Sequence, residues 1–351
     1  MIKHYLKVAF RNLVKYKTQS LVSIIGLAVG FTCFALSVLW IRYEMTYDTF
    51  HNGADRIYMV CAHYTDSPSS TSNVTPYPLA NYLQEKMPEI EATASTSIYR
   101  DMKFRLGDNE QEVVMATADS VFMNFFNIRL LKGTVNFLKE NDPEIAITEE
   151  FARKLFGSED ALGKEVALSG RPRKIGAIVS GWSRHSNIPY SVLSSARRYP
   201  RWSSKGEQLF IRVRAGVDRD TFQKKMEDID ILDIPKESEL AKLLITPISA
   251  LRYSDYVSKV DVVISFSYIF YFSLAGGLVI ICSLFNYLTL YISRLCMRSR
   301  EMALRKVNGA SNTSLSVQFA IELLLILCIA LLCGLLMIEV SMSGFLNFTQ
   351  I

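Results

Sequence analysis

Residues 294–322 read RLCMRSREMALRKVNGASNTSLSVQFAIE and join two apolar segments of the chain. The first half of this stretch holds one acidic residue, Glu301, and five basic ones: Arg294, Arg298, Arg300, Arg305 and Lys306. Lys and Arg resist translocation, so a basic connection between membrane-length segments marks the cytoplasmic side of a bilayer. The pattern predicts a short amphipathic cytoplasmic helix that Gly309 ends and a following spanning helix that Ser311 caps.

Three segments are uncharged over a membrane-relevant length: Thr18–Ile41, Val262–Ser293 and Leu323–Ile338. A helix needs about 20 apolar residues to cross the hydrocarbon core, or roughly 17 at the short end. The third segment reaches that length when Glu322 or Glu339 lies in the interface. We therefore predict three transmembrane helices, at residues 18–41, 262–293 and 316–340.

The charges divide sharply along the chain. Residues 1–17 hold five basic groups and no acid, whereas residues 43–261 hold 28 of the 39 basic and 31 of the 34 acidic groups. The basic excess lies at two membrane-flanking edges, which does not indicate a nucleic-acid-binding patch. Both edges belong on the inside, so residues 42–261 form a large extracytoplasmic domain between the first and second spans.

The first span carries a stripe of small residues, Ser23, Gly26 and Gly30, that would let another helix approach closely. Asn286 is a lone amide in the second span and is expected to hydrogen-bond to a neighbouring helix. The alternative is that glycine is simply common in spans. Ahead of the first span, the basic residues of segment 1–17 recur every four positions, which predicts a cytoplasmic amphipathic helix on anionic membrane lipid.

The extracytoplasmic domain is predicted to be α/β. Residues 56–64 and 208–213 alternate as strands do, and residues 78–87 favour a helix. Thr148 is placed to cap a helix over residues 149–156, and paired strands are expected on either side of Ser169-Gly170. The Ser/Pro/Thr-rich segment 65–78 and the Arg/Ser/Pro-rich segment 194–206 are predicted to be loops or junctions between subdomains. Cys61 is the one cysteine in this domain, so the domain has no internal disulfide.

No known catalytic motif is complete in this sequence. Residues 157–165 resemble a phosphate-binding loop, but five residues separate the glycines and Glu165 stands where Ser or Thr would hold magnesium. The four histidines form no zinc motif, and no G-x-S-x-G occurs. We predict that this chain is not an enzyme, with no catalytic residue, no metal site and no cofactor of its own.

The string RSREMALRKVNGAS, residues 298–311, resembles the signature of MacB-like and FtsX-like ABC transporter permeases. Segments 77–93, 118–134, 147–168 and 175–193 resemble, in the expected order, the MacB-like periplasmic core domain. The resemblance covers nearly the whole chain. It implies a two-lobed periplasmic domain and a permease of the bacterial inner membrane, multi-pass, with a cytoplasmic N-terminus.

The resemblance also implies partners. A cytosolic ABC ATPase dimer, which itself binds ATP and Mg, would dock on the coupling segment 294–315 and drive export, efflux or mechanotransmission through the second span. The candidate contacts are Arg298, Arg300, Glu301, Arg305 and Lys306 for charge, Met302 and Leu304 for packing, and Gly309 and Ser311 in the turn. A homodimer or a pair with a second permease half is expected, with a periplasmic partner also open.

Family units have four spans, but here residues 341–351 are predicted to be an extracytoplasmic tail. We therefore expect a C-terminally short permease, either a truncated product or the first part of a split one. Two alternatives stay open: a membrane-anchored periplasmic sensor or binding protein without ATPase coupling, and a non-functional permease half. A membrane-tethered hydrolase is disfavoured because no nucleophile and base occur together.

Overall fold

The computed structural model describes residues 2–140, 142–157, 160–182, 185–196, 200–229, 233–253, 256–257, 265–307 and 311–349. The chain divides into two compact units. The first unit combines Met1–Glu44 with Phe266–Ile351, and the second is Met45–Ser265. The predicted architecture, with an α/β domain between the first and second of three apolar helices, is confirmed.

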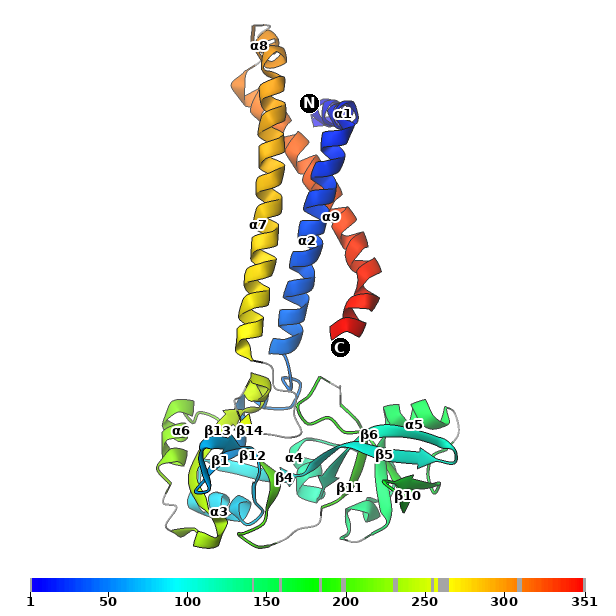
Figure 1. The fold of residues 1–351 in the computed structure, drawn as a ribbon, viewed down its shortest axis with the longest axis vertical. Helices are drawn as coiled ribbons and strands as arrows, with labels where there is room; N and C mark the ends of the chain where they lie inside the picture. The colour runs from blue at the N-terminus through cyan, green and yellow to red at the C-terminus, as the bar shows by residue number, and fades with distance from the viewer. Residues whose placement is uncertain are drawn as a thin grey trace. The chain divides into compact units, whose positions relative to one another are not determined.

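The first unit is a helical bundle of α1 (Ile2–Lys15), α2 (Lys17–Met45), α7 (Phe266–Met297), α8 (Ser299–Val307) and α9 (Asn312–Thr349). Among the described residues, α2, α7 and α9 are long and apolar enough to cross a membrane. They run alongside one another, and α1 lies across one end of α2 (Figure 1). The helix α9 continues to Thr349, past the predicted end of the last span at Val340, because residues 341–349 contain no proline or charge to end it.

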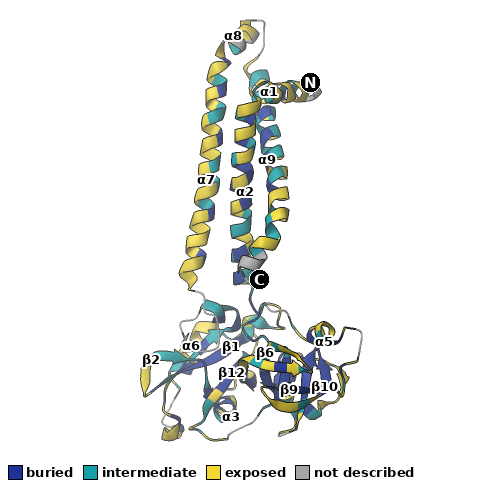
Figure 2. Cartoon of the chain, turned by 45° about the vertical axis from the view of Figure 1, so that its right-hand side comes forward, coloured by how far each residue is buried: buried dark blue, intermediate teal, exposed yellow. Residues whose placement is uncertain are grey.

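The core of the bundle is small, with buried residues from all three long helices: Leu27, Tyr287, Ile326 and Ala330. On α7 only four residues are buried: Ile269, Gly276, Tyr287 and Arg294. Exposed residues follow nearly the whole length of α7 (Figure 2). A helix that is apolar on all sides suits a surrounding of lipid or of another membrane subunit.

The second unit holds two sheets, and the first is antiparallel in the order β13-β1-β12-β4. Its elements follow the chain as β1 (Ile57–Tyr64), α3 (Leu79–Lys86), β4 (Ile90–Thr96), β12 (Lys205–Val213), α6 (Arg219–Glu227) and β13 (Leu240–Pro247). This is the split β-α-β arrangement of ferredoxin-like folds, because each helix links two strands that are separated by one strand. Three short strands extend the sheet: β2 (Ser67–Ser72), β3 (Thr75–Pro76) and β14 (Tyr256–Val257).

The second sheet is inserted between β4 and β12. Its strands are β5 (Ile98–Leu106), β6 (Asn109–Ala118), β7 (Leu130–Gly133), β8 (Glu144–Thr148), β9 (Glu165–Leu168), β10 (Arg171–Val179) and β11 (Val192–Ser195). The strand order is β10-β8-β11-β6-β5-β9, and β9 pairs again with β10, so six strands close into a barrel, with β7 added to β10. Two helices accompany it, α4 (Ser120–Phe125) and α5 (Glu149–Phe156).

Short 3-10 turns complete the unit: η1 (Ala54–Arg56), η2 (Val135–Leu138), η4 (Lys236–Ser238) and η5 (Ile248–Tyr253). One apolar core joins the two sheets, since Met59 and Phe210 of the first pack with Ala116 and Leu193 of the second. A second core lies under α3 and α6, and a third fills the barrel beside α5. The shared core binds the two sheets into one compact domain.

Several local predictions are confirmed. Thr148 Oγ1 accepts a hydrogen bond from Phe151 N at 3.3 Å, and α5 ends at Gly157. The β9–β10 hairpin turns at Ser169 and Gly170, both with positive φ. The prediction of a loop over residues 65–78 is wrong, because this segment gains backbone pairing as β2 beside β1 and as β3 beside β12.

The segment that follows α2 is fastened to the loop before β11 through the buried Asp48. Its carboxylate accepts hydrogen bonds from Ser186 Oγ, from Asn187 N at 2.9 Å and from Asn187 Nδ2 at 2.7 Å. Asp48 has a φ of 57°, a conformation that Asp tolerates better than most residues. Three hydrogen bonds to one carboxylate thus fix the start of the second unit against this loop.

Candidate functional site

The turn between α7 and α8 lies in the stretch that the sequence singled out. Arg298 N donates to Arg294 O at 3.1 Å, and Met302 N donates to Arg298 O at 3.0 Å. Arg298 is a turn residue between the two helices, and these two backbone hydrogen bonds link it to the last turn of α7 and to the first turn of α8.

The Arg298 side chain points into the bundle. Its Nη1 lies 3.2 Å from Glu322 Oε1 and 3.1 Å from Glu322 Oε2, and both side chains are nearly fully buried. The guanidinium carbon also lies 5.8 Å from the ring centre of Phe319, one turn before Glu322 on α9. A buried arginine needs a partner for its charge, and here α9 supplies the partner.

Two further contacts close this end of the bundle. Arg294 Nε donates to Gln19 Oε1 at 3.1 Å, which joins α7 to α2. Tyr291 OH donates to Phe319 O at 3.2 Å, which joins α7 to α9. The helices α2 and α9 are thus each tied to α7 within two turns of α8.

The helix α8 exposes apolar side chains next to this polar end. Leu304 is 66% exposed and Val307 is 85% exposed, and Met297 at the end of α7 is 67% exposed. Lys306 is exposed and Met302 is half-buried. The backbones of Arg300, Glu301 and Arg305 are helical, but their side chains and Gly309 lie outside the described residues. Ser311 Oγ accepts a hydrogen bond from Ser314 N at 3.2 Å and caps α9, as expected.

The small residues of α2 lie at its contact with α7. A Cβ added to Gly30 would lie 2.6 Å from Ser283 Cβ, closer than atoms can approach, whereas one added to Gly26 would lie 3.5 Å from Asn286 Nδ2. Ser23 is buried. Close approach of α2 and α7 therefore depends on the missing side chain at Gly30.

Arg298 is predicted to be a charged contact for a partner, but in the structure its side chain turns inward, and Glu322, Arg294 and Gln19 lie in the same region. The available signal was Glu322, an acidic residue at the edge of an apolar run, because a buried carboxylate requires a cation nearby. Among the described residues, no group of three or more His, Cys, Asp or Glu side chains could hold a metal ion.

Comparison with known families identifies both parts of the chain. Residues 20–229 match the family model of the MacB-like periplasmic core domain. Residues 244–349 match that of the FtsX-like permease C-terminal segment. A search of curated proteins gave no match.

Three solved structures resemble part of the chain. A domain of a putative permease protein from Porphyromonas gingivalis is 23% identical and covers 60% of this chain and 95% of its own, with a TM-score of 0.47. The extracellular domain of the noncanonic ABC-type transporter YknZ from Gram-positive bacteria is 12% identical and covers 54% and 99%, with a TM-score of 0.40. The periplasmic region of MacB from Actinobacillus actinomycetemcomitans is 14% identical and covers 56% and 91%, with a TM-score of 0.39.

The family matches cover well over half of the chain and lie in the order that the helices and the α/β unit require. The chain belongs to the MacB-like and FtsX-like family of ABC transporter permeases.

Proposed function

We propose that this permease couples ATP hydrolysis by a separate cytosolic ATPase dimer to movement of its periplasmic domain, with α8 as the docking helix. The observation that carries the proposal is that α8 exposes Leu304 and Val307 while the Arg298–Glu322 pair ties the turn just before α8 to α9. The proposal combines a surface for a partner with a rigid connection behind it.

The exposed residues of α8 suit a protein partner. Exposed apolar side chains on a short polar helix are commonly part of an interface, and a surrounding of basic residues gives the interface charge selectivity. The basic residues of segments 1–17 and 294–306 support a cytoplasmic location for both segments under the positive-inside rule. The cytoplasm is also where ATP is available to a partner.

The movement would pass along α7. This helix has 32 residues and is about 48 Å long at 1.5 Å per residue. It begins at Phe266, directly after the last residue of the second unit. The helix α2 leads into the first residue of that unit. A continuous helix transmits displacement, so a shift of α8 would move the chain segment that enters the periplasmic domain.

The exposed apolar length of α7 supports a further part of the proposal, a second permease subunit in the membrane. Lateral association would cover apolar side chains of α7 that are exposed in the single chain. Either a second copy of this chain or a different permease half satisfies this argument.

The experiment is affinity purification of the tagged chain in mild detergent, with retained ATP-binding-cassette proteins identified by mass spectrometry and tested for ATP hydrolysis. Leu304→Asp should reduce the retained ATPase at least about tenfold, because a charge replaces an apolar interface residue. Val121→Asp is the matched control, since Val121 is also exposed but lies on α4 of the periplasmic domain. Retention of the ATPase by Leu304→Asp at the wild-type level contradicts the proposal, as does the absence of any such ATPase with the wild-type chain.

A further inference from the structure

A pocket of about 750 Å³ opens at one end of the six-stranded barrel in the second unit. Its size falls within the range of small-molecule sites, and barrel mouths are frequent locations for such sites. It also borders both chain connections between the two sheets, since Ser97 and Ser204 line it. A ligand bound there would touch the barrel and the first sheet together.

The pocket continues the interior of the barrel. On β6, Val113 belongs to the barrel core, and Met115 and Thr117 follow on the same face because side chains alternate along a strand. On β10, Ile175 belongs to that core and Arg173 and Arg171 follow in the same way. From the packed core toward the mouth, the residues that face the barrel interior thus change from apolar to polar.

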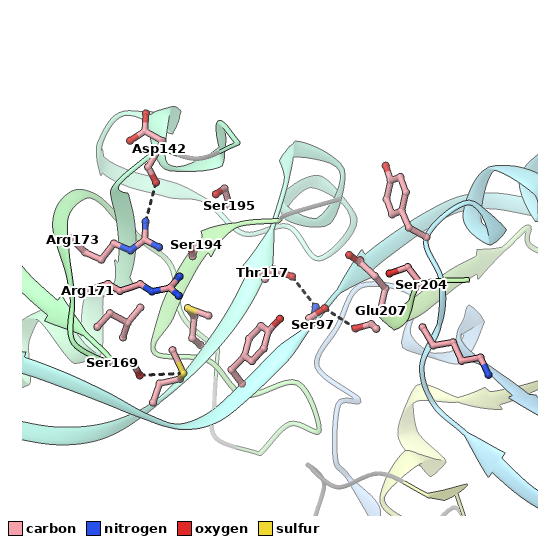
Figure 3. Close-up of a pocket in the computed structure, with 17 residues that line it drawn as sticks. Ser97, Thr117, Asp142, Ser169, Arg171, Arg173, Ser194, Ser195, Ser204 and Glu207 are labelled. Carbon is pink, nitrogen blue, oxygen red and sulfur yellow. Dashed lines mark hydrogen bonds between the residues drawn. The ribbon is translucent and has the colours of Figure 1, made fainter. Parts of the chain in front are cut away.

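The cations of the pocket are concentrated on β10. The guanidinium of Arg171 has no ion pair or hydrogen bond with any residue that the structure describes. Arg173 donates from Nη1 to the Asp142 backbone oxygen at 3.2 Å, and its buried Nε has no hydrogen-bond partner among the described residues. Figure 3 shows both guanidinium groups near Ser194. A buried donor without a partner costs free energy, so this corner favours an acceptor.

The other charged residues of the pocket do not neutralise this corner. Lys205 pairs with Glu239 at 2.7 Å. The Asp142 carboxylate accepts a hydrogen bond from Glu144 N at 2.9 Å and points away from Arg173 (Figure 3). Glu207 lies on the opposite side of the pocket, on the first sheet (Figure 3). The corner formed by Arg171 and Arg173 on β10 is therefore the part of the pocket that favours an anion.

The floor between these sides is apolar. Leu168 belongs to the barrel core, and Met102 and Met115 pack against it. Tyr99 stands beside them and is 47% exposed. Methionine side chains adapt to ligands of different shape, and an exposed tyrosine ring offers a flat apolar contact.

We propose that the barrel mouth binds a small anionic amphiphile, with its carboxylate, sulfonate or phosphate on Arg171 and Arg173 and its apolar or aromatic body on Met102, Met115 and Tyr99. This site is separate from α8, so ligand binding does not depend on an ATPase. The two proposals can therefore fail independently.

The test measures binding to the full-length chain in lipid nanodiscs by equilibrium dialysis, with binding to empty nanodiscs subtracted. The probes are naphthalene-2-sulfonate, the neutral 2-naphthylmethanol and methanesulfonate. Naphthalene-2-sulfonate should bind saturably to one site, and the other two at least about tenfold more weakly, because each lacks one half of the recognised chemistry.

Variants locate the site. Arg171→Gln/Arg173→Gln should weaken naphthalene-2-sulfonate at least about tenfold, since two charge-assisted donors are lost. Tyr99→Ala, at an exposed position, should weaken it severalfold and leave the methanesulfonate affinity unchanged. Arg105→Gln is the matched control, because Arg105 is an exposed arginine on β5 that does not line the pocket. Absence of saturable binding to the wild-type chain overturns the proposal, and so does unchanged binding by both the arginine and the tyrosine variants.

Discussion

Arg298 and Glu322 lie 24 residues apart in the chain and form a buried ion pair, 3.1 Å between Nη1 and Oε2, that fastens the α7–α8 turn to α9. Both side chains are nearly fully buried. Each charge is tolerable inside the bundle only because the other is present. The pair therefore fixes the start of α8 next to α9.

Removing one member of this pair should be costly. Glu322→Gln leaves Arg298 buried with a neutral partner and should lower stability by about 3–5 kcal/mol, whereas Arg298→Met/Glu322→Leu removes both charges and should cost little. Thermal unfolding of the three proteins in one detergent measures the difference. Equal losses for the single and the double variant would show that the pair is not a coupled unit.

The contact between α2 and α7 should depend on Gly30. Gly30→Ala places a methyl group 2.6 Å from Ser283 Cβ, so the helices must separate and stability should fall by about 1–3 kcal/mol. Ser283→Gly in the same chain should restore most of the loss. Gly277→Ala is the control, because no atom lies near its added Cβ. A Gly30→Ala protein that melts like the wild type argues against a close α2–α7 contact.

Cysteine labelling tests the proposed orientation. Cys296 is exposed near the end of α7, and Ser69 is exposed on β2. In a variant whose Cys33, Cys282, Cys328 and Cys333 are alanine, an impermeant maleimide added to intact spheroplasts should label Ser69→Cys and should leave Cys296 unlabelled until the membrane is opened. Labelling of Cys296 from outside would falsify the cytoplasmic placement of α8.

The Cys61 thiol should resist alkylation in the folded protein. Burial raises its pKa to about 11, and the thiolate is the reactive form, so iodoacetamide at pH 8 should modify Cys61 only after denaturation. The unfolded thiol has a pKa of about 8.5, so its stabilising contribution is complete below that pH and is lost as the pH rises toward 11. Cys61→Ala should remove this alkaline component from a stability profile. Rapid alkylation of native Cys61 at pH 8 contradicts the expected burial.

The Asp48 carboxylate should be important for the domain that follows α2. Asp48→Ala leaves the donors of Ser186 and Asn187 without their acceptor and should lower the free energy of unfolding by about 3 kcal/mol. Ser186→Ala removes one donor and should cost about 1 kcal/mol. Denaturant unfolding monitored by the fluorescence of nearby Trp182 compares the two variants. A smaller loss for Asp48→Ala than for Ser186→Ala is inconsistent with this arrangement.

Features that depend on neighbouring residues in the chain could be predicted from the sequence. The three apolar helices follow from uncharged runs, because burial of charge in hydrocarbon is costly wherever the helix packs. The caps of α5 and α9, at Thr148 and Ser311, follow from side chains that reach amide groups within one turn. The β9–β10 hairpin follows from a turn of two residues.

The tertiary structure alone decided which distant residues meet. The closing of the barrel requires β9 to pair with both β5 and β10, and no local pattern specifies a second partner strand. Arg298 reads as a surface charge in its own helix, and only the position of α9 makes it a buried partner of Glu322. Likewise, Arg171 on β10 and Met115 on β6 share a pocket because two strands lie between them on either side of the closed barrel, an arrangement that depends on contacts far apart in the chain.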